Sequence, residues 1–279
     1  MTSRFLSLWF PRLGAERWLR LGACAPDRPF ATVTLGRGSR LGSLNAAAEA
    51  DGLWAGQTLA EAMDACGDLA VLPDDPAATE RLLGALARAA GRLGVRARIG
   101  SPDLLTVRID RLPPVIGDES TLMARALTAA ISAGLSARPG IADTAGAAEA
   151  LARCGAGTAA QGTAAHGTAG RIAARGGTRQ ALAPLPVDAL RLGPAARRRL
   201  YRLGVRRIGE IADLPPVAIR RYLGAEIADR MEDVLGAAAP LAAGQDAGQG
   251  AGHSAAPAAG GAVVHFAAVP MAEPARRRA

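Results

Sequence analysis

Apolar and polar positions alternate along the first half of the chain in a way that predicts strands and helices in turn. The clearest strand covers residues 103–110, where Leu105, Val107 and Ile109 fall on one face and polar side chains on the other. The clearest helix covers residues 75–93, where apolar residues recur every three to four positions along one stripe. Both periods require a buried face, so this half of the chain is expected to build a layered core.

The same criteria define the remaining elements of this half. Strands are expected at residues 5–10, 30–35, 71–72, 103–110 and 136–142. Helices are expected at residues 15–21, 44–50, 75–93, 120–133 and 144–153, with one more that opens at the capping box of Thr58 and Glu61. Strands that alternate with helices predict an α/β sheet layered with helices on one face.

The pattern changes after residue 154. Residues 155–180 are rich in Gly, Ala and Thr and are expected to form a low-complexity linker. Residues 184–238 predict a small all-helical unit, because short apolar stripes are broken repeatedly by Gly and Pro. Residues 239–279 are rich in Ala, Gly, Pro and Gln and predict a disordered tail.

Composition adds a preference for polyanions. The chain has 279 residues and a net charge of +8, and Arg supplies every basic side chain because no Lys occurs. Such a charge attracts nucleic acid. A GC-rich coding sequence also favours Arg over Lys, so the charge by itself leaves the partner open.

The rare residue types exclude several classes of site. Cys24, Cys66 and Cys154 are far apart, and the three His side chains have no ligand spacing. We therefore expect a reducing compartment and no structural metal. No apolar run approaches the roughly 18 residues of a membrane span, so the chain is expected to be cytoplasmic, with no membrane partner.

Four stretches resemble the Y-family translesion DNA polymerases, the UmuC/DinB-like family. They are residues 6–12 followed by Glu16, residues 43–73, residues 140–144 and residues 203–215. The second is similar to the fingers motif N-x-x-A-x-x-x-G, and the last looks like the helix–hairpin–helix of the thumb. They occur in the family's order and together cover about residues 4 to 238.

This resemblance implies a fold and a domain plan. Residues 1–22 and 70–154 correspond to a palm, residues 23–69 to an inserted fingers segment, and residues 184–238 to a helix–hairpin–helix thumb. The expected fold class is thus an α/β, or α+β, palm with inserted fingers plus a small all-α thumb. The family's little-finger domain has no counterpart in this sequence.

The positions that carry catalysis in the family are degenerate here. Nucleotidyl transfer uses two divalent cations held by carboxylate oxygens. Ser7 stands where the resemblance places the first metal-binding Asp, Asp103 is kept, and Leu104 replaces a Glu. A slip of one residue in this alignment still leaves a single carboxylate. We therefore expect no catalytic residues, no metal and no cofactor, with Mg²⁺ required only if the site is active after all.

The nucleotide-binding positions are degenerate as well. Arg12 replaces an aromatic residue that screens the sugar, while Ala46 and Glu49 replace the Tyr and Arg that hold the triphosphate. An anion at a phosphate-binding position repels the ligand. The resemblance is therefore to the catalytically inactive, ImuB-type branch of the family.

The thumb-like stretch predicts a DNA contact. Gly204 and Gly209 have a spacing that lets backbone N–H groups approach a phosphate, and Arg202, Arg206 and Arg207 lie beside them. Such contacts are independent of sequence and sensitive to salt. The alternative is a solvated Arg-rich helix face.

Together these features predict a non-catalytic, DNA-binding adaptor in DNA damage tolerance, which covers translesion synthesis, SOS mutagenesis and DNA repair. By resemblance, its partners are primer–template DNA, an error-prone replicative-type polymerase, a RecA-like companion and the sliding clamp. Two alternatives stay open. One is an active error-prone polymerase that uses Asp103 and Asp110, and the other is a truncated, non-functional relic.

Overall fold

A five-stranded sheet forms the centre of the molecule. The computed structural model describes residues 3–36, 38–92, 97–110, 112, 116–154 and 171–236. The strand order is β5-β6-β1-β7-β8. These strands are β1 (Phe5–Trp9), β5 (Ala97–Ser101), β6 (Leu104–Arg108), β7 (Arg138–Ala142) and β8 (Arg171–Ile172). β1 is antiparallel to both β6 and β7, and β7 is parallel to β8.

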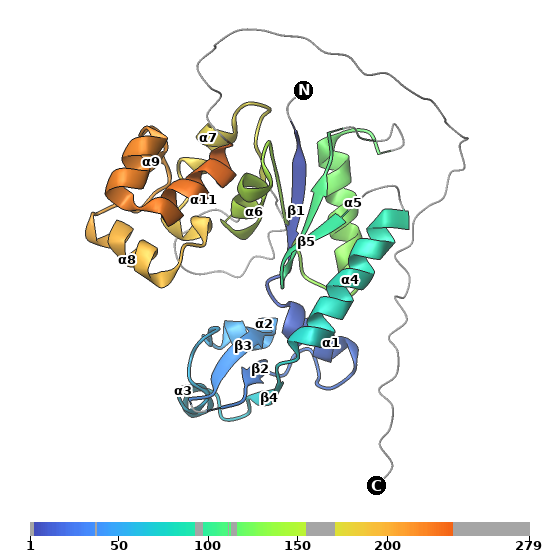
Figure 1. Cartoon of the computed structure of the whole chain (residues 1–279). Helices are drawn as coiled ribbons and strands as arrows, with labels where there is room; N and C mark the ends of the chain where they lie inside the picture. Colours follow the sequence, from blue (N-terminus) through green and yellow to red (C-terminus); the bar gives the residue numbers. More distant parts are fainter. Residues whose placement is uncertain are drawn as a thin grey trace.

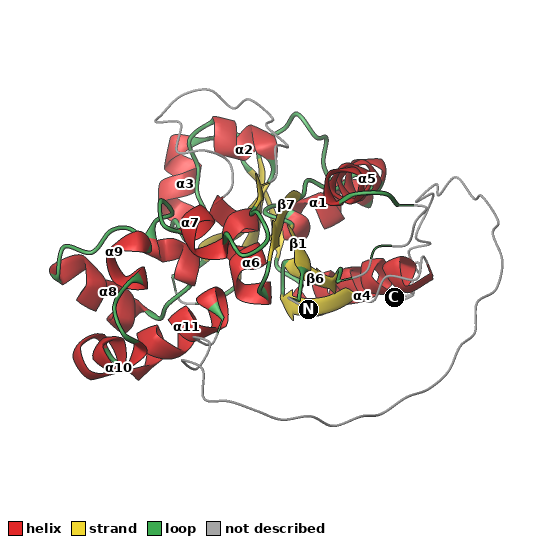
Figure 2. Cartoon of the chain, turned by 90° about the horizontal axis from the view of Figure 1, so that it is seen from above, coloured by secondary structure: helices red, strands yellow, loops and turns green. Residues whose placement is uncertain are grey.

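Helices cover both faces of this sheet, so the prediction of a single helical layer was wrong. Along β1, Leu6 and Leu8 pack into the clusters formed with α4 (Pro76–Arg92) and α5 (Glu119–Ser132). Phe5, which points the other way, packs against the cluster that contains α6 (Ala145–Cys154). Figures 1 and 2 show α4 and α5 on the side of the strands opposite α6. The strand is apolar on both faces, and a sheet buried on both faces needs two layers of cover.

Gly140 fixes how closely α6 approaches the sheet. A Cβ atom at this position would lie 2.4 Å from the carbonyl oxygen of Ala148 and 2.6 Å from the amide nitrogen of Ala152. Real Cβ atoms do not come so near to backbone atoms, so only glycine fits here. The result is a helix pressed directly onto β7.

A smaller three-stranded sheet lies at one end of the molecule (Figure 1). It contains β2 (Phe30–Thr34), β3 (Arg40–Leu44) and β4 (Ala70–Pro73), and is accompanied by α1 (Leu13–Arg20), α2 (Ala46–Ala50) and α3 (Leu59–Ala65). The predicted capping box of Thr58 and Glu61 opens α3 and is confirmed.

The sequence pattern missed three of the described strands, β3, β5 and β8. β3 occupies part of the predicted helix 44–50, which starts only at Ala46 because Asn45 caps it. The buried Asn45 side chain accepts hydrogen bonds from the Ala48 and Phe30 amides and donates to two backbone carbonyls. β5 was also missed, since its burial is too slight to leave an apolar pattern.

The C-terminal described part is a helical unit. It comprises α7 (Thr178–Leu182), a 3₁₀ turn η1 (Val187–Leu190), α8 (Pro194–Arg202), α9 (Gly209–Ala212), α10 (Pro216–Ala218), a π-helical turn η2 (Ile219–Leu223) and α11 (Ala225–Leu235). These elements share one apolar core with α6, which includes Leu151, Leu182, Leu200 and Ile227. We call residues 178–235 the helical unit.

The predicted linker 155–180 extends too far. Residues 171–172 form β8, because Ala173 and the strand hydrogen-bond to β7, and residues 178–182 form α7. Residues 155–170 and the predicted tail at 239–279 lie outside the described residues. Among the described helices, none has the length and apolarity to cross a membrane.

Candidate functional site

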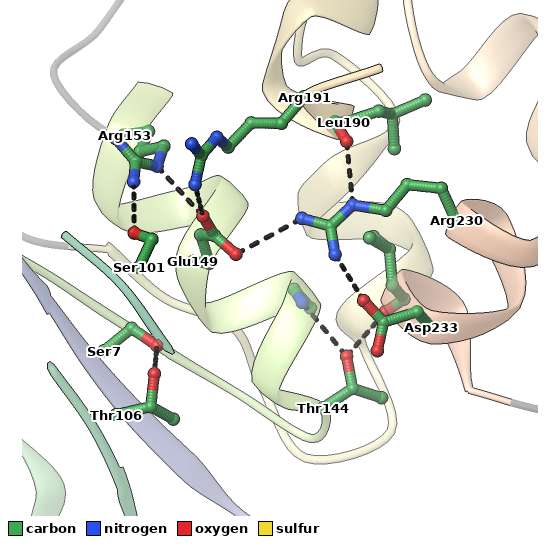
Figure 3. A network of polar contacts seen from close by, with 12 residues as sticks. Ser7, Ser101, Thr106, Thr144, Glu149, Arg153, Leu190, Arg191, Arg230 and Asp233 are labelled. Carbon is green, nitrogen blue, oxygen red and sulfur yellow. Dashed lines mark hydrogen bonds and ion pairs between the residues drawn. The ribbon is translucent and has the colours of Figure 1, made fainter. Parts of the chain in front are cut away.

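Ser7 lies in the middle of β1, at the centre of the large sheet. The register places it between Thr106 of β6 and Gly140 of β7. Its side chain is fully buried, and its hydroxyl lies 3.0 Å from the Thr106 hydroxyl (Figure 3). Two neutral hydroxyl groups therefore satisfy each other where the resemblance implies a metal-binding carboxylate.

Asp103 lies in the turn between β5 and β6, and both of its oxygens are engaged. Arg153 of α6 donates to them in a fork, at 2.7 Å and 3.0 Å. Ser101 donates to one oxygen at 2.8 Å, and the Trp9 indole N–H donates to the other at 2.8 Å. The Arg153 guanidinium also stacks 5.1 Å from the centre of the Trp9 ring. The single carboxylate kept at this site is thus fully used within the protein.

These contacts keep Asp103 ionised. Partial burial by itself raises the pKa of a carboxyl group, but the hydrogen bonds from Arg153 and Ser101 and the Arg153 charge outweigh it and lower the pKa of Asp103 to about 2. Arg153 therefore acts as the counter-ion of this carboxylate.

Leu104 follows Asp103 and is the first residue of β6, paired with Trp9. Its side chain is buried and packs close to Gly100 of β5. An acidic residue at this position would face an apolar neighbour. Leu104 therefore contributes packing and no ligand atom.

Arg12 and Glu49 form an ion pair that joins the start of α1 to α2. The Arg12 Nε and Nη2 atoms lie 3.0 Å and 2.5 Å from Glu49 Oε2. The hydrogen bond to Glu49 raises the pKa of Arg12. These are two of the three positions expected to contact a nucleotide, and the third, Ala46, has only a methyl side chain. Arg12, the one cation among these three positions, is therefore paired with an anion of the protein itself.

The five predicted DNA-binding residues lie together at the end of α8 and the turn that follows it. Gly204 has φ of +79°, which a residue with a Cβ atom rarely adopts. The Arg206 guanidinium donates to the Tyr201 carbonyl at 2.8 Å and stacks 4.6 Å from the Tyr201 ring centre. Arg202 and Arg207 are exposed, and their side chains make no hydrogen bond or ion pair with other described residues.

The role predicted for Gly209 was wrong. Its N–H donates to the Ala183 carbonyl at 3.0 Å, and a Cβ atom on it would lie 3.0 Å from that same oxygen. The glycine therefore lets the hairpin pack against the end of α7, and its amide is not free for a phosphate. The Arg206 amide is also engaged, since it donates to the Glu210 carboxylate at 2.9 Å. The amides of Arg206 and Gly209 are therefore both used within the protein, which leaves the exposed arginine side chains as the charged groups of this turn.

Comparison with known sequences identifies the family. Residues 26–153 match the model described as the impB/mucB/samB family. Protein ImuB of Caulobacter vibrioides, in two strains, is 36% identical over 187 residues, which are 67% of this chain and 38% of that protein. Residues 26–153 thus form an impB/mucB/samB domain, the domain of the UmuC/DinB Y-family, and the chain is a homologue of ImuB. It spans well under half the length of the ImuB proteins it matches.

Solved structures show the same fold. DinB from Sulfolobus solfataricus matches with a TM-score of 0.63 and 15% identity, over 83% of this chain and 66% of that one. The insertion ternary complex of Dbh DNA polymerase matches with a TM-score of 0.65 and 15% identity, over 83% of this chain and 67% of that one. The mixed α/β fold is therefore that of a Y-family palm and fingers.

The residues present do not fit the two metal ions that catalysis by the family implies. Of the three aligned positions, Ser7 offers a hydroxyl already bonded to Thr106, Leu104 offers no ligand, and Asp103 is held by Arg153. No group of three His, Cys, Asp or Glu side chains that could hold a metal ion occurs within the described part of the chain. Hard divalent ions need several oxygen ligands at once.

The rival pairing of Asp103 with Asp110 is not supported by the strand geometry. The two residues flank β6 at opposite ends, and at about 3.3 Å per residue they are on the order of 20 Å apart. Asp110 accepts instead from the Arg4 amide at 2.7 Å and from the Arg108 side chain. One metal cannot bridge these carboxylates.

Sequence reasoning missed the residues that organise the site. Glu149 of α6 accepts from Arg153 at 3.0 Å, from Arg191 at 2.9 Å and from Arg230 at 3.2 Å (Figure 3). The four-residue spacing of Glu149 and Arg153 in a predicted helix was the one available signal. Arg191 and Arg230 lie far along the sequence, and only the packing of the helical unit on α6 brings them here.

Proposed function

We propose that this protein is a non-catalytic Y-family homologue that binds DNA as an adaptor in DNA damage tolerance. Its homology to ImuB supports a role in that process. The observation that carries the non-catalytic part is the forked contact of Arg153 with Asp103, which puts an internal cation on the last carboxylate of the site. The Arg12–Glu49 pair supports it independently at the nucleotide side.

The DNA-binding part rests on the basic surface of the helical unit. Arg198, Arg199, Arg202 and Arg207 are exposed and have no ion-pair partner among the described residues. Unpaired guanidinium groups suit phosphate oxygens, which they contact in a planar fork. Because these contacts ignore base identity, we expect binding to primer–template DNA of any sequence, weakened steeply by salt.

Binding of fluorescent primer–template DNA across a salt series tests this proposal. The test variant is Arg202→Glu/Arg207→Glu, and the matched control is Arg88→Glu/Arg125→Glu, which makes the same charge change on exposed positions of α4 and α5. We expect the test variant to lose at least about tenfold in affinity and the control to lose much less. Equal losses of affinity in the two double variants would mean that DNA binding depends on the net charge of the protein and not on this surface.

Parallel reactions with Mg²⁺ or Mn²⁺ and nucleotides test the absence of catalysis. We expect no primer extension with either ion. Any extension that purifies with the protein and disappears in Asp103→Asn would instead establish the active-polymerase alternative. Failure of the soluble, folded protein to bind DNA at low salt would favour a non-functional relic or a scaffold that contacts proteins only.

The proposed partners follow from family resemblance. They are an error-prone replicative-type polymerase, a RecA-like companion and the sliding clamp, and a cytoplasmic location is proposed with them. Pull-down of each purified partner by this chain, with and without DNA, measures these interactions separately from DNA binding.

A further inference from the structure

We infer that Arg153 and Glu149 form an internal ion-pair lock, which holds the helical unit on the sheet. The lock begins at Asp103, passes through Arg153 to Glu149, and ends on Arg191 and Arg230 of the helical unit. This concerns the geometry of the protein alone, so it does not rest on DNA binding.

The sheet end of the lock is anchored by several contacts. Arg153 donates to both oxygens of Asp103 and to the Ser101 hydroxyl at 3.0 Å, and its guanidinium stacks on Trp9. Its side chain is only 13% exposed. A planar guanidinium held in this way has little freedom, so Arg153 fixes the distance between α6 and the turn of β5 and β6.

Glu149 is the centre of the lock. Its side chain is 12% exposed and accepts hydrogen bonds from three arginines that come from three elements. Figure 3 shows Arg153, Arg191 and Arg230 converging on this one carboxylate. A partly buried carboxylate in contact with three cations is strongly favoured in its ionised form, and the loss of its charge would leave three cations without a shared partner.

The backbone at Arg191 supports a specific requirement for this geometry. Arg191 has φ of +52°, and among the described residues it is the one non-glycine residue with positive φ. Such a conformation costs an L-residue about 1 kcal/mol or more and persists when the surroundings demand it. Here it directs the Arg191 side chain from the end of η1 back to Glu149.

The far end of the lock lies where α11 meets α6. Arg230 donates to the Leu190 carbonyl at 2.7 Å and also contacts Asp233. The Thr144 hydroxyl, just before the start of α6, donates to the Val234 carbonyl at 2.6 Å (Figure 3). Gly146 of α6 lies close to α11, because a Cβ atom at this position would be only 2.9 Å from the Asp233 carboxylate. The helical unit is therefore seated closely on α6.

A lock of this type does not respond to ligands. A metal ion orders a site only while it is bound, whereas a guanidinium belongs to the chain and stays charged at all physiological pH values. The orientation of the helical unit relative to the sheet should thus be the same with and without divalent ions.

Hydrogen exchange measured by mass spectrometry on the full chain tests the inference. The variants are Arg153→Gln and Glu149→Gln, and the control is Arg220→Gln, which removes exposed ion pairs to Asp229 and Glu232 within the helical unit. We expect exchange in η1 and α11 to rise at least about tenfold in both variants, while the control changes it less than about twofold. Peptides from α4 and α5 provide the internal reference, and their exchange should stay within about twofold of wild type.

Several results would overturn the lock. They are equal exchange in Glu149→Gln and Arg220→Gln, a uniform rise over α4 and α5 as well, or slower exchange of η1 and α11 in wild type on addition of Mn²⁺. Arg153→Lys keeps the positive charge but cannot donate to both oxygens of Asp103 in a planar fork. This variant replaces the Gln variants in the experiment if those are insoluble. We expect it to raise exchange in η1 and α11 about threefold, and no change in that variant would equally exclude the lock.

Discussion

The arginines of the sheet and those of the helical-unit surface have opposite surroundings. At the sheet, Arg4 and Arg153 are almost wholly buried, and each contacts two carboxylates. At the end of α8 and the turn beyond it, Arg202 and Arg207 are exposed and have no such partner among the described residues. Charge that is already paired inside a protein stabilises or orients the fold, and only unpaired charge remains for a ligand.

This difference is what the proposed function uses. Arg153 occupies both oxygens of the Asp103 carboxylate, whereas Arg202 and Arg207 have no ion-pair partner among the described residues. The following predictions test this contrast, beginning with the largest effect.

Replacing Arg4 with Met should cost about 3–5 kcal/mol of unfolding free energy, because it leaves Glu119 and Asp143 without their shared cation. Arg4 also donates to the Ala173 carbonyl at 2.5 Å, so the start of β1 loses its tie to β8. Urea unfolding measures the change. The matched variant Arg207→Met should stay within about 0.5 kcal/mol of wild type. Equal costs for the two variants would contradict the comparison.

Restoring the first carboxylate with Ser7→Asp should destabilise the protein by about 3 kcal/mol. The side chain is fully buried, and the new charge would face the Thr106 hydroxyl with no cation nearby. Ser7→Ala removes one hydrogen bond and should cost about 1 kcal/mol. Thermal unfolding with and without Mn²⁺ gives the decisive comparison, since a marked rise in Tm of Ser7→Asp with Mn²⁺ would reveal a functional metal site.

The contact between Asp103 and Arg153 should make the unfolding free energy depend on pH in the acidic range. Its pKa of about 2 is below the ordinary value of 3.8, so its stabilising contribution is present above about pH 4 and is lost as the pH falls toward 2. The shift corresponds to at most about 2 kcal/mol, and to less after solvent screening because the side chain is 34% exposed. The gap in unfolding free energy between wild type and Asp103→Asn should therefore narrow as the pH falls from about 4 to about 2.

Glu16 supplies a contrast of opposite sign. Burial raises its pKa, although hydrogen bonds donated by Ser136 lower it in part. Its contribution is therefore greatest below the ordinary pKa of a Glu and is lost as the pH rises through the raised value. The unfolding free energy of Glu16→Gln should therefore rise relative to that of wild type as the pH rises through the raised pKa of Glu16. The same pH trend in Glu16→Gln and Asp103→Asn would contradict the opposite directions of the two pKa shifts.

The smallest effects are expected on the slope of DNA affinity against salt. Arg202→Ala and Arg207→Ala should each reduce the slope of log K against log salt by about 0.7–0.9, the value for one phosphate contact. Neither should change the unfolding free energy by more than about 0.5 kcal/mol. An unchanged slope in both variants would move the DNA contact to another surface.

Much of the architecture was accessible from local patterns. The alternation of residues 103–110 predicted β6, the apolar stripe of residues 75–93 predicted α4, and the capping box of Thr58 and Glu61 predicted α3. These signals depend on neighbouring residues, because a helix or strand face is set by spacing along one segment. β5 and β8 gave no such pattern, because β5 is mostly exposed and the two-residue β8 is determined by pairing with β7, which lies far from it in sequence.

The sequence by itself determined that Ser7 and Leu104 carry no carboxylate, because the identity of a side chain needs no coordinates to establish. Tertiary structure alone decided what replaced them. Arg153 reaches Asp103, and Arg191 and Arg230 reach Glu149, across 50, 42 and 81 positions of sequence. It also decided that Gly209 serves the packing of the hairpin. Contacts of this kind depend on how whole elements pack together. The ion-pair partner of a buried charge is therefore visible only in the folded structure.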